Sequence, residues 1–252
     1  MNERKRDDVA GAGTVWFTET GKMIGAFANA GYSFVFIGEK HLFMKLLIAG
    51  ATGLVGRHVL EKALHDERVR AVIAPGRQAA GIHPKLFSPV VDFDNLLVGE
   101  SGWQVDAVIC TLGTTMKKAG SKEAFYRVDH DYPLAVARLA RKHGTSSFVL
   151  TSAAGADVSS RFFYYRVKGE VERELASMGF ESLTFVRPGL IGGRRDEPRP
   201  LETSLGLVKK ILHPLLPKSW RINPAEKIAD RLLKAALASK AGTHVVTSEE
   251  MA

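Results

Sequence analysis

The sequence has one cysteine, and this scarcity limits how the fold can be held together. Cys110 has no second cysteine to pair with, so an internal disulfide is excluded and a reducing compartment is favoured. We therefore expect a cytoplasmic protein. Histidines with the spacing of metal ligands are also missing, since His130 and His213 have no companions at such spacing. No metal site is expected.

Long apolar runs and blocks of like charge are missing too. No stretch reaches the roughly 18 consecutive apolar residues that a membrane-spanning helix needs, so no membrane is expected as a partner. The formal charge is +8, but the 35 basic residues are spread along the chain without a long Lys/Arg block. Such a surface suits a phosphate-rich small molecule better than nucleic acid, and we expect no nucleic-acid partner.

The chain has the composition of an ordinary globular protein, with 45% hydrophobic residues among 252. Residues 1–43 differ from the rest: they are rich in Gly and Ala and lack a helical apolar period, although Tyr32–Ile37 is compatible with a short strand. Met44 starts a clean apolar run. The sequence therefore predicts an N-terminal extension outside the fold, followed by one domain over residues 44–252.

From Met44 onward, short apolar runs alternate with helical segments. The runs expected to form buried parallel strands are Lys45–Ala49, Val69–Ala74, Pro89–Val91, Ala107–Cys110, Phe148–Thr151 and Leu183–Val186. The expected helices are Val55–His65, Ala135–Lys142, Tyr165–Met178, Ser204–Leu212 and Ala225–Ser239. This order predicts an α/β fold with a doubly wound parallel sheet, a Rossmann fold. Residues 190–252 are expected to form a small substrate-side lid, with Trp220 over the cleft.

The first strand leads into a glycine-rich loop and then into a helix. Small residues allow a tight turn, let the backbone approach a pyrophosphate and let the helix pack closely on the strand. The helix N-terminus then offers free N–H donors and a partial positive charge. We therefore expect the domain to bind a nicotinamide dinucleotide cofactor, NAD(P), through the whole loop: Gly50, Ala51, Thr52, Gly53, Leu54, Val55 and Gly56.

The residues after the second strand bear on the choice of cofactor. An acidic residue there would bind the ribose 2′-hydroxyl of NAD, whereas arginine suits the 2′-phosphate of NADP. Here the strand is followed by Arg77, and no acidic residue occurs before Asp92. The sequence therefore favours NADP. Asp92 and Phe93, after the third strand, are candidate adenine contacts.

A serine, a tyrosine and a lysine have the spacing of a reductase site. Ser152 follows a strand, and Tyr164 and Lys168 come later, four residues apart on one face of a helix. An ammonium near a phenol is expected to lower the pKa of the phenol, so that Tyr164 can exchange a proton near neutral pH. Ser152 would hold the carbonyl or alcohol oxygen of a small substrate. Tyr165, the neighbouring phenol, is interpreted as a packing or substrate-pocket residue.

Taken together, several segments resemble an atypical short-chain dehydrogenase/reductase of the Tat-interacting-protein (oxidoreductase-like) family. The segments are LIAGATGLVG (Leu47–Gly56), VICTLGTT (Val108–Thr115), RVDHDY (Arg127–Tyr132), SAAGAD (Ser152–Asp157), YYRVKGEVE (Tyr164–Glu172) and RPG (Arg187–Gly189). The resemblance implies NADPH binding and a Ser152, Tyr164 and Lys168 site. It also implies cofactor contacts from Leu112, Gly113, Thr114, Tyr164, Lys168 and Pro188.

The chain departs from the family pattern at one position, and the resemblance leaves several classes of function open. Many short-chain reductases have an asparagine in the proton relay, where this chain has Asp129. An NADPH-dependent carbonyl reductase is the first hypothesis. Two alternatives are an NADPH-binding regulatory protein that acts through a protein partner, and a sugar-nucleotide epimerase or dehydratase. Whether the chain forms a homodimer is left open.

Overall fold

The computed structural model describes residues 15–17, 23–25, 36–38, 43–96, 103–192 and 222–251. Its backbone falls into two compact units, residues 1–43 and Met44–Ala252. The first unit contains three short strands, β1 (Val15–Phe17), β2 (Met23–Gly25) and β3 (Phe36–Gly38), paired antiparallel in that order. The expected strand at Tyr32–Ile37 thus corresponds in part to β3, which pairs with β2.

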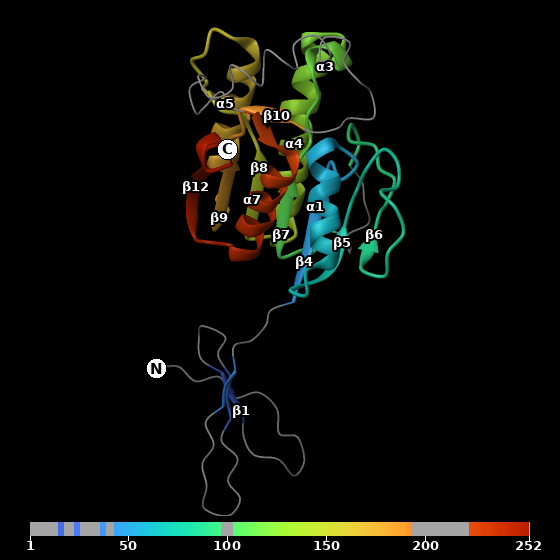
Figure 1. The fold of residues 1–252 in the computed structure, drawn as a ribbon, viewed down its shortest axis with the longest axis vertical. Coiled ribbons are helices and arrows are strands. Elements are labelled where there is room, and N and C mark those ends of the chain that lie inside the picture. Colours follow the sequence, from blue (N-terminus) through green and yellow to red (C-terminus); the bar gives the residue numbers. More distant parts are fainter. Residues whose placement is uncertain are drawn as a thin grey trace, which may run out of the picture. The chain divides into compact units, whose positions relative to one another are not determined.

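The second unit is built on a parallel sheet in which seven strands follow the order β12-β9-β8-β7-β4-β5-β6 (Figure 1). The strands are β4 (Met44–Ala49), β5 (Val69–Ile73), β6 (Leu86–Phe87), β7 (Ala107–Cys110), β8 (Ser147–Thr151), β9 (Ser182–Val186) and β12 (Gly242–Val246). All neighbouring strands in this sheet are paired in parallel. The predicted doubly wound Rossmann fold is confirmed.

The order of the strands reverses direction between β4 and β7. Successive strands run outward on one side of β4 through β5 and β6, and on the other side from β7 through β8 and β9. In open α/β sheets, ligands bind outside the carboxyl ends of the strands at such a switch point. The glycine loop after β4 and the Leu112–Thr114 segment after β7 therefore lie at the expected binding edge.

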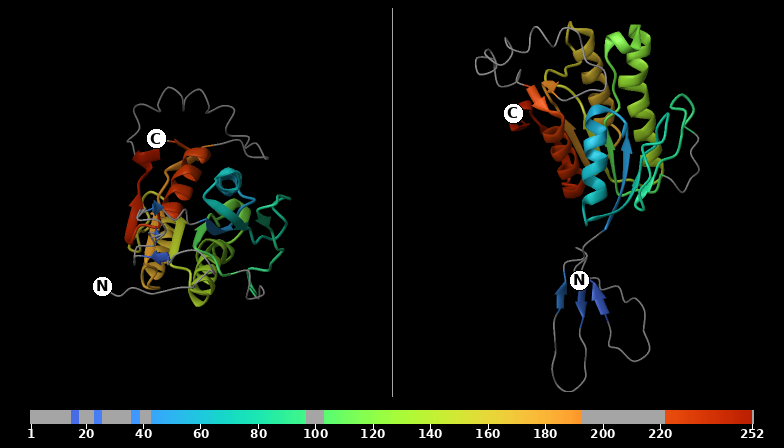
Figure 2. Two further views of the ribbon diagram at one scale, coloured as in Figure 1. Left: turned by 90° about the horizontal axis from the view of Figure 1, so that it is seen from below. Right: turned by 45° about the vertical axis from the view of Figure 1, so that its right-hand side comes forward.

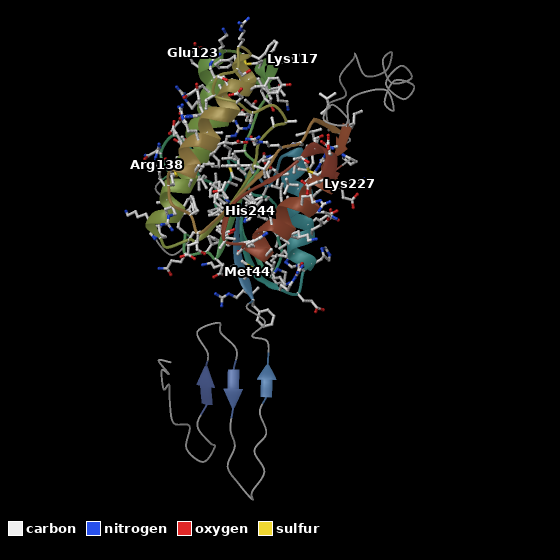
Figure 3. The ribbon with its side chains drawn as sticks, turned by 90° about the vertical axis from the view of Figure 1, so that its left-hand side faces the viewer. Met44, Lys117, Glu123, Arg138, Lys227 and His244 are labelled. Carbon is white, nitrogen blue, oxygen red and sulfur yellow. The ribbon has the colours of Figure 1, made fainter. Side chains whose placement is uncertain are left out.

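Helices cover both faces of the sheet (Figures 2 and 3). On one face α1 (Leu54–His65) and α7 (Ala225–Ala238) pack with buried residues such as Val59 and Leu232. On the other face α4 (Tyr132–Lys142) and α5 (Phe163–Ala176) pack with buried residues such as Leu134 and Val171. The expected helices at these four places are confirmed, within a few residues at their ends.

The chain that leads into α4 is helical for longer than the sequence pattern indicates. After α2 (Met116–Ala119), α3 (Lys122–Tyr126) runs into a π-helical turn at Arg127–Asp131, and α4 follows without a break. Pro133 lies in the first turn of α4, where its missing N–H costs no helical hydrogen bond. The π-helical turn is of interest because such turns are frequent at functional sites. It buries Asp129 and His130.

Within the seven-stranded sheet, one expected strand is wrong in position and one strand was missed. The third strand of the series is β6, at Leu86–Phe87, whereas at the expected Pro89–Val91 only a single bridge joins Val90 to Gly76. Pro89 has no N–H to donate, which explains why the ladder is interrupted there. The missed strand is β12, which pairs with β9.

Two further expectations concern the C-terminal part and membranes. A two-stranded parallel sheet joins β10 (Leu190–Gly192) to β11 (Ile222–Pro224), and a 3-10 turn follows at Ser248–Met251. The expected helix at Ser204–Leu212 and the covering Trp220 lie outside the described residues. Within the described ranges, no helix is both long and apolar enough to cross a membrane.

Candidate active site

The glycine loop has a backbone that only small residues can adopt. Gly50 has a φ of +86°, in the left-handed region that favours glycine, and a Cβ there would lie 2.8 Å from Thr111 Oγ1. A Cβ on Gly56 would overlap the Gly50 carbonyl oxygen, so α1 can approach β4 this closely only without a side chain. These are the roles that the sequence assigned to the first and third glycines.

The N-terminus of α1 is left open to an anion. Gly53 is the N-cap residue, no side chain caps the helix, and its first turn carries no acidic residue. The first backbone N–H groups of a helix have no partner within the helix, and they carry a partial positive charge. Together with the close backbone approach that Gly50 and Gly56 permit, this arrangement fits the pyrophosphate of a dinucleotide.

The segment that follows β5 carries the residue expected to select the cofactor. Arg77 is exposed and has no hydrogen-bond or ion-pair partner within the described part of the chain. Its guanidinium is therefore available to an external phosphate. Asp92 is also exposed, and its carboxylate accepts the N–H of Asp94 at 3.0 Å.

The Phe93 ring is not available as a stacking surface for an adenine. It is buried and stacks on Tyr132, with 5.4 Å between the ring centroids. Any adenine contact at this position would come from the backbone of Phe93, while the ring belongs to the core beneath α4.

A buried ion pair links the π-helical turn before α4 to α5. The Nζ atom of Lys168 lies 2.8 Å from Oδ1 of Asp129, and both side chains are almost fully buried. The other oxygen, Oδ2, accepts the backbone N–H of Thr114 at 2.7 Å. A Cβ on Gly113 would lie 3.3 Å from Asp129 Oδ1 and 3.9 Å from Lys168 Nζ. The structure thus brings the predicted Gly113, Thr114 and Lys168 together around Asp129.

Asp129 belongs to this site, and its contacts with Lys168 and Thr114 were not predicted from the sequence. The sequence identified it only as a departure from the usual asparagine. Its partner Lys168 is 39 residues further along the chain, on another helix. The ion pair also explains how a lysine can stay charged while buried: burial lowers the pKa of Lys168, but Asp129 and Tyr164 raise it above its ordinary value.

The Tyr164 phenol does not behave as the sequence led us to expect. Its pKa is raised, chiefly because the surrounding protein shields the phenol from solvent although 39% of the residue's surface is exposed, and the negative charge of Asp129 adds to that rise. Lys168 opposes the rise without overcoming it. The expected net lowering of the Tyr164 pKa is therefore wrong: Lys168 does lower it, but burial, which is the largest effect, raises it further.

Aromatic rings surround Tyr164. Phe125 lies on one side, with 5.9 Å between ring centroids, and Tyr165 packs edge-on at 5.2 Å. A Cβ on Gly155 would lie 3.4 Å from the Tyr165 ring, so Tyr165 packs against the backbone of the loop after β8. These contacts agree with a packing role for Tyr165, and Tyr164 keeps 39% of its surface exposed.

Ser152 lies at the carboxyl end of β8, directly after its last residue. Its backbone N–H donates to the carbonyl oxygen of Val186 in β9 at 2.7 Å, whereas its buried Oγ has no hydrogen-bond partner among the described residues. Buried hydroxyls of Ser147, Thr151 and Ser182 share this condition, so Ser152 is distinguished by its place at the carboxyl end of β8. Pro188 is buried next to it, and its carbonyl accepts the N–H of Ala154 at 2.8 Å.

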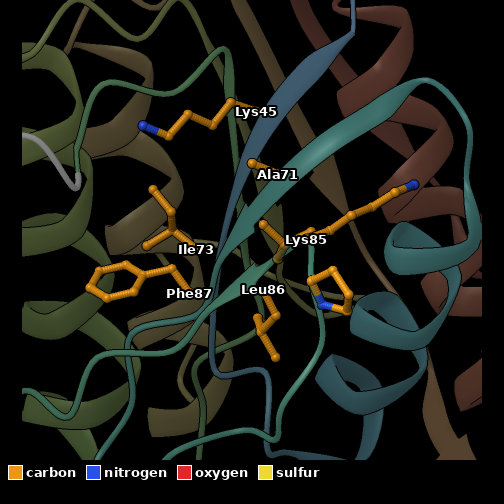
Figure 4. A pocket seen from close by; sticks show the side chains of 8 residues that line it. Lys45, Ala71, Ile73, Lys85, Leu86 and Phe87 are labelled. Carbon is orange, nitrogen blue, oxygen red and sulfur yellow. The ribbon is translucent and has the colours of Figure 1, made fainter.

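Two other features near the sheet do not belong to this site. Burial raises the pKa of the Cys110 thiol to about 12, so Cys110 is an inert core residue. A shallow pocket of about 270 Å³ lies against β5 and the segment Pro84–Phe87 (Figure 4). It shares no residue with the candidate active site.

Comparison with known proteins defines the class of protein. A family model described as NAD(P)H-binding matches residues 50–207, which include the glycine loop and the Ser152, Tyr164 and Lys168 positions. Protein HTATIP2 from Rattus norvegicus is 38% identical over 180 residues, which cover 69% of this chain and 72% of that protein. The chain belongs to the atypical short-chain dehydrogenases/reductases of the HTATIP2 family. It is an NAD(P)-binding, oxidoreductase-like protein.

Fungal relatives correct one expectation. The protein named fmp52, mitochondrial, from Emericella nidulans is 39% identical over 168 residues, covering 62% of this chain and 70% of that protein. The protein of the same name from Aspergillus fumigatus is 34% identical over 215 residues, covering 81% and 92%. The expected cytoplasmic location, drawn from the single cysteine, is therefore wrong: a reducing compartment is not peculiar to the cytoplasm.

Solved structures share the fold at low sequence identity. The nucleoside-diphosphate-sugar epimerase from Agrobacterium tumefaciens superposes with a TM-score of 0.62 at 17% identity, covering 88% of this chain and 80% of that one. A short-chain dehydrogenase family protein from Francisella tularensis gives 0.61 at 14% identity, covering 82% and 98%. At these identities the likeness establishes the Rossmann fold and no activity.

Proposed function

We propose that the protein is an NADPH-dependent reductase of a small carbonyl compound. The observation that carries the proposal is the grouping of Lys168, Asp129 and Gly113 at the carboxyl edge of the sheet, with Tyr164 about one helical turn before Lys168 on α5. It connects α5, which carries the proposed proton donor Tyr164, to the Leu112–Thr114 segment that we expect to contact the cofactor. The unpartnered Oγ of Ser152 supplies a hydrogen-bond donor at the same edge.

Each of the chain's own residues has a part in the reaction. The N–H groups at the start of α1 would hold the pyrophosphate, and Lys168 would bind the nicotinamide ribose. When bound, the reduced nicotinamide supplies the hydride that reduces the carbonyl carbon. Ser152 would donate a hydrogen bond to the carbonyl oxygen as negative charge develops there. Tyr164 would give that oxygen its proton, which completes the alcohol.

The preference for NADPH follows from Arg77. The side chain is exposed and unpaired within the described residues, directly after β5, where the adenosine ribose is held in this fold. A guanidinium can form two hydrogen bonds with a 2′-phosphate, and no carboxylate stands at this position to bind the 2′-hydroxyl of NAD.

The test combines cofactor binding with turnover. We expect the purified protein to bind NADPH at least tenfold more tightly than NADH, and to oxidise NADPH in the presence of some member of an aldehyde and ketone panel. A sugar nucleotide in the same panel tests the epimerase alternative. NADPH binding without turnover on any compound would reject the reductase and favour a regulatory protein that acts through a partner. Equal binding of the two cofactors would reject the role of Arg77.

A further inference from the structure

Asn223 is a buried asparagine that joins two segments far apart in the chain. It belongs to the short strand β11 and is fully buried. Its Oδ1 accepts the backbone N–H of Gly189 at 2.7 Å and the hydroxyl of Ser248 at 2.8 Å, while its Nδ2 donates to the Ser248 carbonyl at 2.9 Å. A backbone N–H can only donate and a carbonyl can only accept, so these contacts fix the orientation of the amide.

The segment that Asn223 holds borders the candidate active site. Gly189 follows Pro188, whose carbonyl accepts the backbone N–H of Ala154 at 2.8 Å. The residues directly after β8 are therefore hydrogen-bonded to those directly after β9, which extends the pairing of the two strands. Ser152 lies in the first of these two segments. A displacement of Gly189 would pass through Pro188 to the segment that carries Ser152.

The position of this segment in the sheet indicates which half of the cofactor it faces. In this fold a dinucleotide lies across the switch point of the sheet, with its adenosine ribose beside the residues after the second strand. Here those residues follow β5 and include Arg77, on one side of β4. β8 and β9 lie on the other side of β4, beyond β7. The carboxyl ends of β8 and β9 therefore belong to the nicotinamide half of the site.

We propose that Asn223 is a positioning residue for the nicotinamide half of the cofactor site. It fixes the backbone at Gly189 and, through Pro188, the segment that carries Ser152. It needs no contact with the cofactor or the substrate. The inference rests on the proposed function, which assigns Ser152 to the carbonyl oxygen that is reduced beside the nicotinamide.

The alternative is that Asn223 only attaches the C-terminal 3-10 turn at Ser248–Met251 to the sheet. In that case its loss would leave buried polar groups without partners and lower the stability of the domain. All ligands of the site would then be affected alike. A role at the nicotinamide half affects only the ligands that occupy that half, so two ligands distinguish the two roles.

The test compares two ligands on Asn223→Leu, which removes the amide and keeps a side chain of similar size. NADPH fills both halves of the site, whereas adenosine 2′,5′-bisphosphate lacks the nicotinamide half. Isothermal titration calorimetry measures both affinities and needs no turnover. We expect the Kd for NADPH to rise about tenfold and the Kd for the bisphosphate to stay within about twofold of the wild type. Equal losses for the two ligands, or no loss for either, would overturn the proposal.

A matched control removes a buried hydrogen bond at the other edge of the sheet. Thr145 is fully buried, and its Oγ1 donates to the Val105 carbonyl at 3.1 Å, shortly before β8 begins. Thr145→Val removes this bond and keeps the size of the side chain. The variant should lower Tm and leave the affinity for NADPH relative to the bisphosphate unchanged. A selective loss of NADPH affinity as large as that of Asn223→Leu would overturn the proposal.

A measurement on the wild type decides the question if Asn223→Leu does not fold. Nuclear magnetic resonance can follow the backbone N–H of Gly189 and the side-chain amide of Asn223. NADPH should shift both signals, and adenosine 2′,5′-bisphosphate should leave them in place. Signals that do not respond to NADPH would overturn the proposal.

The outcomes for the wild type separate this inference from the proposed function. If the protein binds NADPH and reduces no carbonyl compound, the proposed function fails, while the comparison of the two ligands still decides the role of Asn223. If it binds NADH instead, NADH and adenosine monophosphate take the place of the two ligands. A wild type that binds neither cofactor would overturn both proposals.

Discussion

The left-handed turn at Gly50 allows the loop geometry to be tested against a control within the same chain. Gly50 and Gly144 have nearly the same backbone conformation, with φ of +86° and +84°. An alanine at Gly144 would meet nothing within 4 Å, whereas at Gly50 its Cβ would lie 2.8 Å from the carbonyl carbon of Thr111 and 2.9 Å from the Leu112 nitrogen. Both substitutions place a Cβ on a left-handed backbone, but only Gly50→Ala also brings that Cβ into a steric clash.

The expected magnitudes follow from this difference. Gly144→Ala should cost about 1–2 kcal/mol, the cost of a left-handed conformation for a residue with a Cβ. Gly50→Ala should lower the free energy of unfolding by about 1–3 kcal/mol more, because the backbone atoms of Thr111 and Leu112, directly after β7, must move to relieve the overlap. For a domain of this size each kcal/mol lowers Tm by roughly 2–4 °C. The gap in Tm between the variants should therefore be on the order of 2–12 °C.

Cofactor binding gives the more specific readout. The atoms that would collide with a Gly50 side chain belong to Thr111 and Leu112, which line the same edge as the glycine loop. We expect Gly50→Ala to weaken NADPH binding at least tenfold, about 1.4 kcal/mol, and Gly144→Ala to leave it unchanged. Thermal unfolding by circular dichroism and fluorescence titration with NADPH measure both effects. Equal losses of Tm and affinity in the two variants would refute the reasoning.

Three other predictions follow from the described contacts and the cofactor assignment. Arg77→Glu should lower NADPH affinity more than tenfold while NADH affinity holds, and unchanged discrimination in a binding titration would move the phosphate contact elsewhere. Cys110 should resist alkylation at pH 8 in the folded protein and react in denaturant, because burial raises its pKa to about 12; equal labelling rates would contradict this. A chain that begins at Met44 should fold and bind NADPH, since the second unit holds its own core; a failure on either count would show that residues 1–43 are required.

The sequence predicted the Rossmann fold well because the strands at its centre are buried on both faces. Runs such as Ala107–Cys110 are continuously apolar and end at the bounds that the structure gives. The edge strand β12 (Gly242–Val246) was missed because it is partly exposed and contains Thr243 and His244, so its pattern lacks a continuous apolar run. The π-helical turn at Arg127–Asp131 was missed for a similar reason: its five residues are mostly polar.

The sequence predicted which residues form the candidate site, but it did not predict their ion pair or the direction of the Tyr164 pKa shift. Spacing along the chain was enough to single out Tyr164 and Lys168, because residues four apart share a helix face. The contact between Lys168 and Asp129 joins two helices 39 residues apart, and no local pattern encodes it. The direction of the Tyr164 pKa shift depends on burial and on that contact, so the sequence alone gave the wrong sign.

The central claim, that Tyr164 donates the proton in an NADPH-dependent reduction, is tested most directly by Tyr164→Phe. NADPH binding and carbonyl-dependent NADPH oxidation should be measured side by side on the wild type and this variant. The account predicts that the variant binds NADPH as tightly as the wild type and loses kcat by about 10²–10⁴-fold, the usual contribution of a positioned general acid. A variant that binds NADPH and keeps full turnover would contradict it.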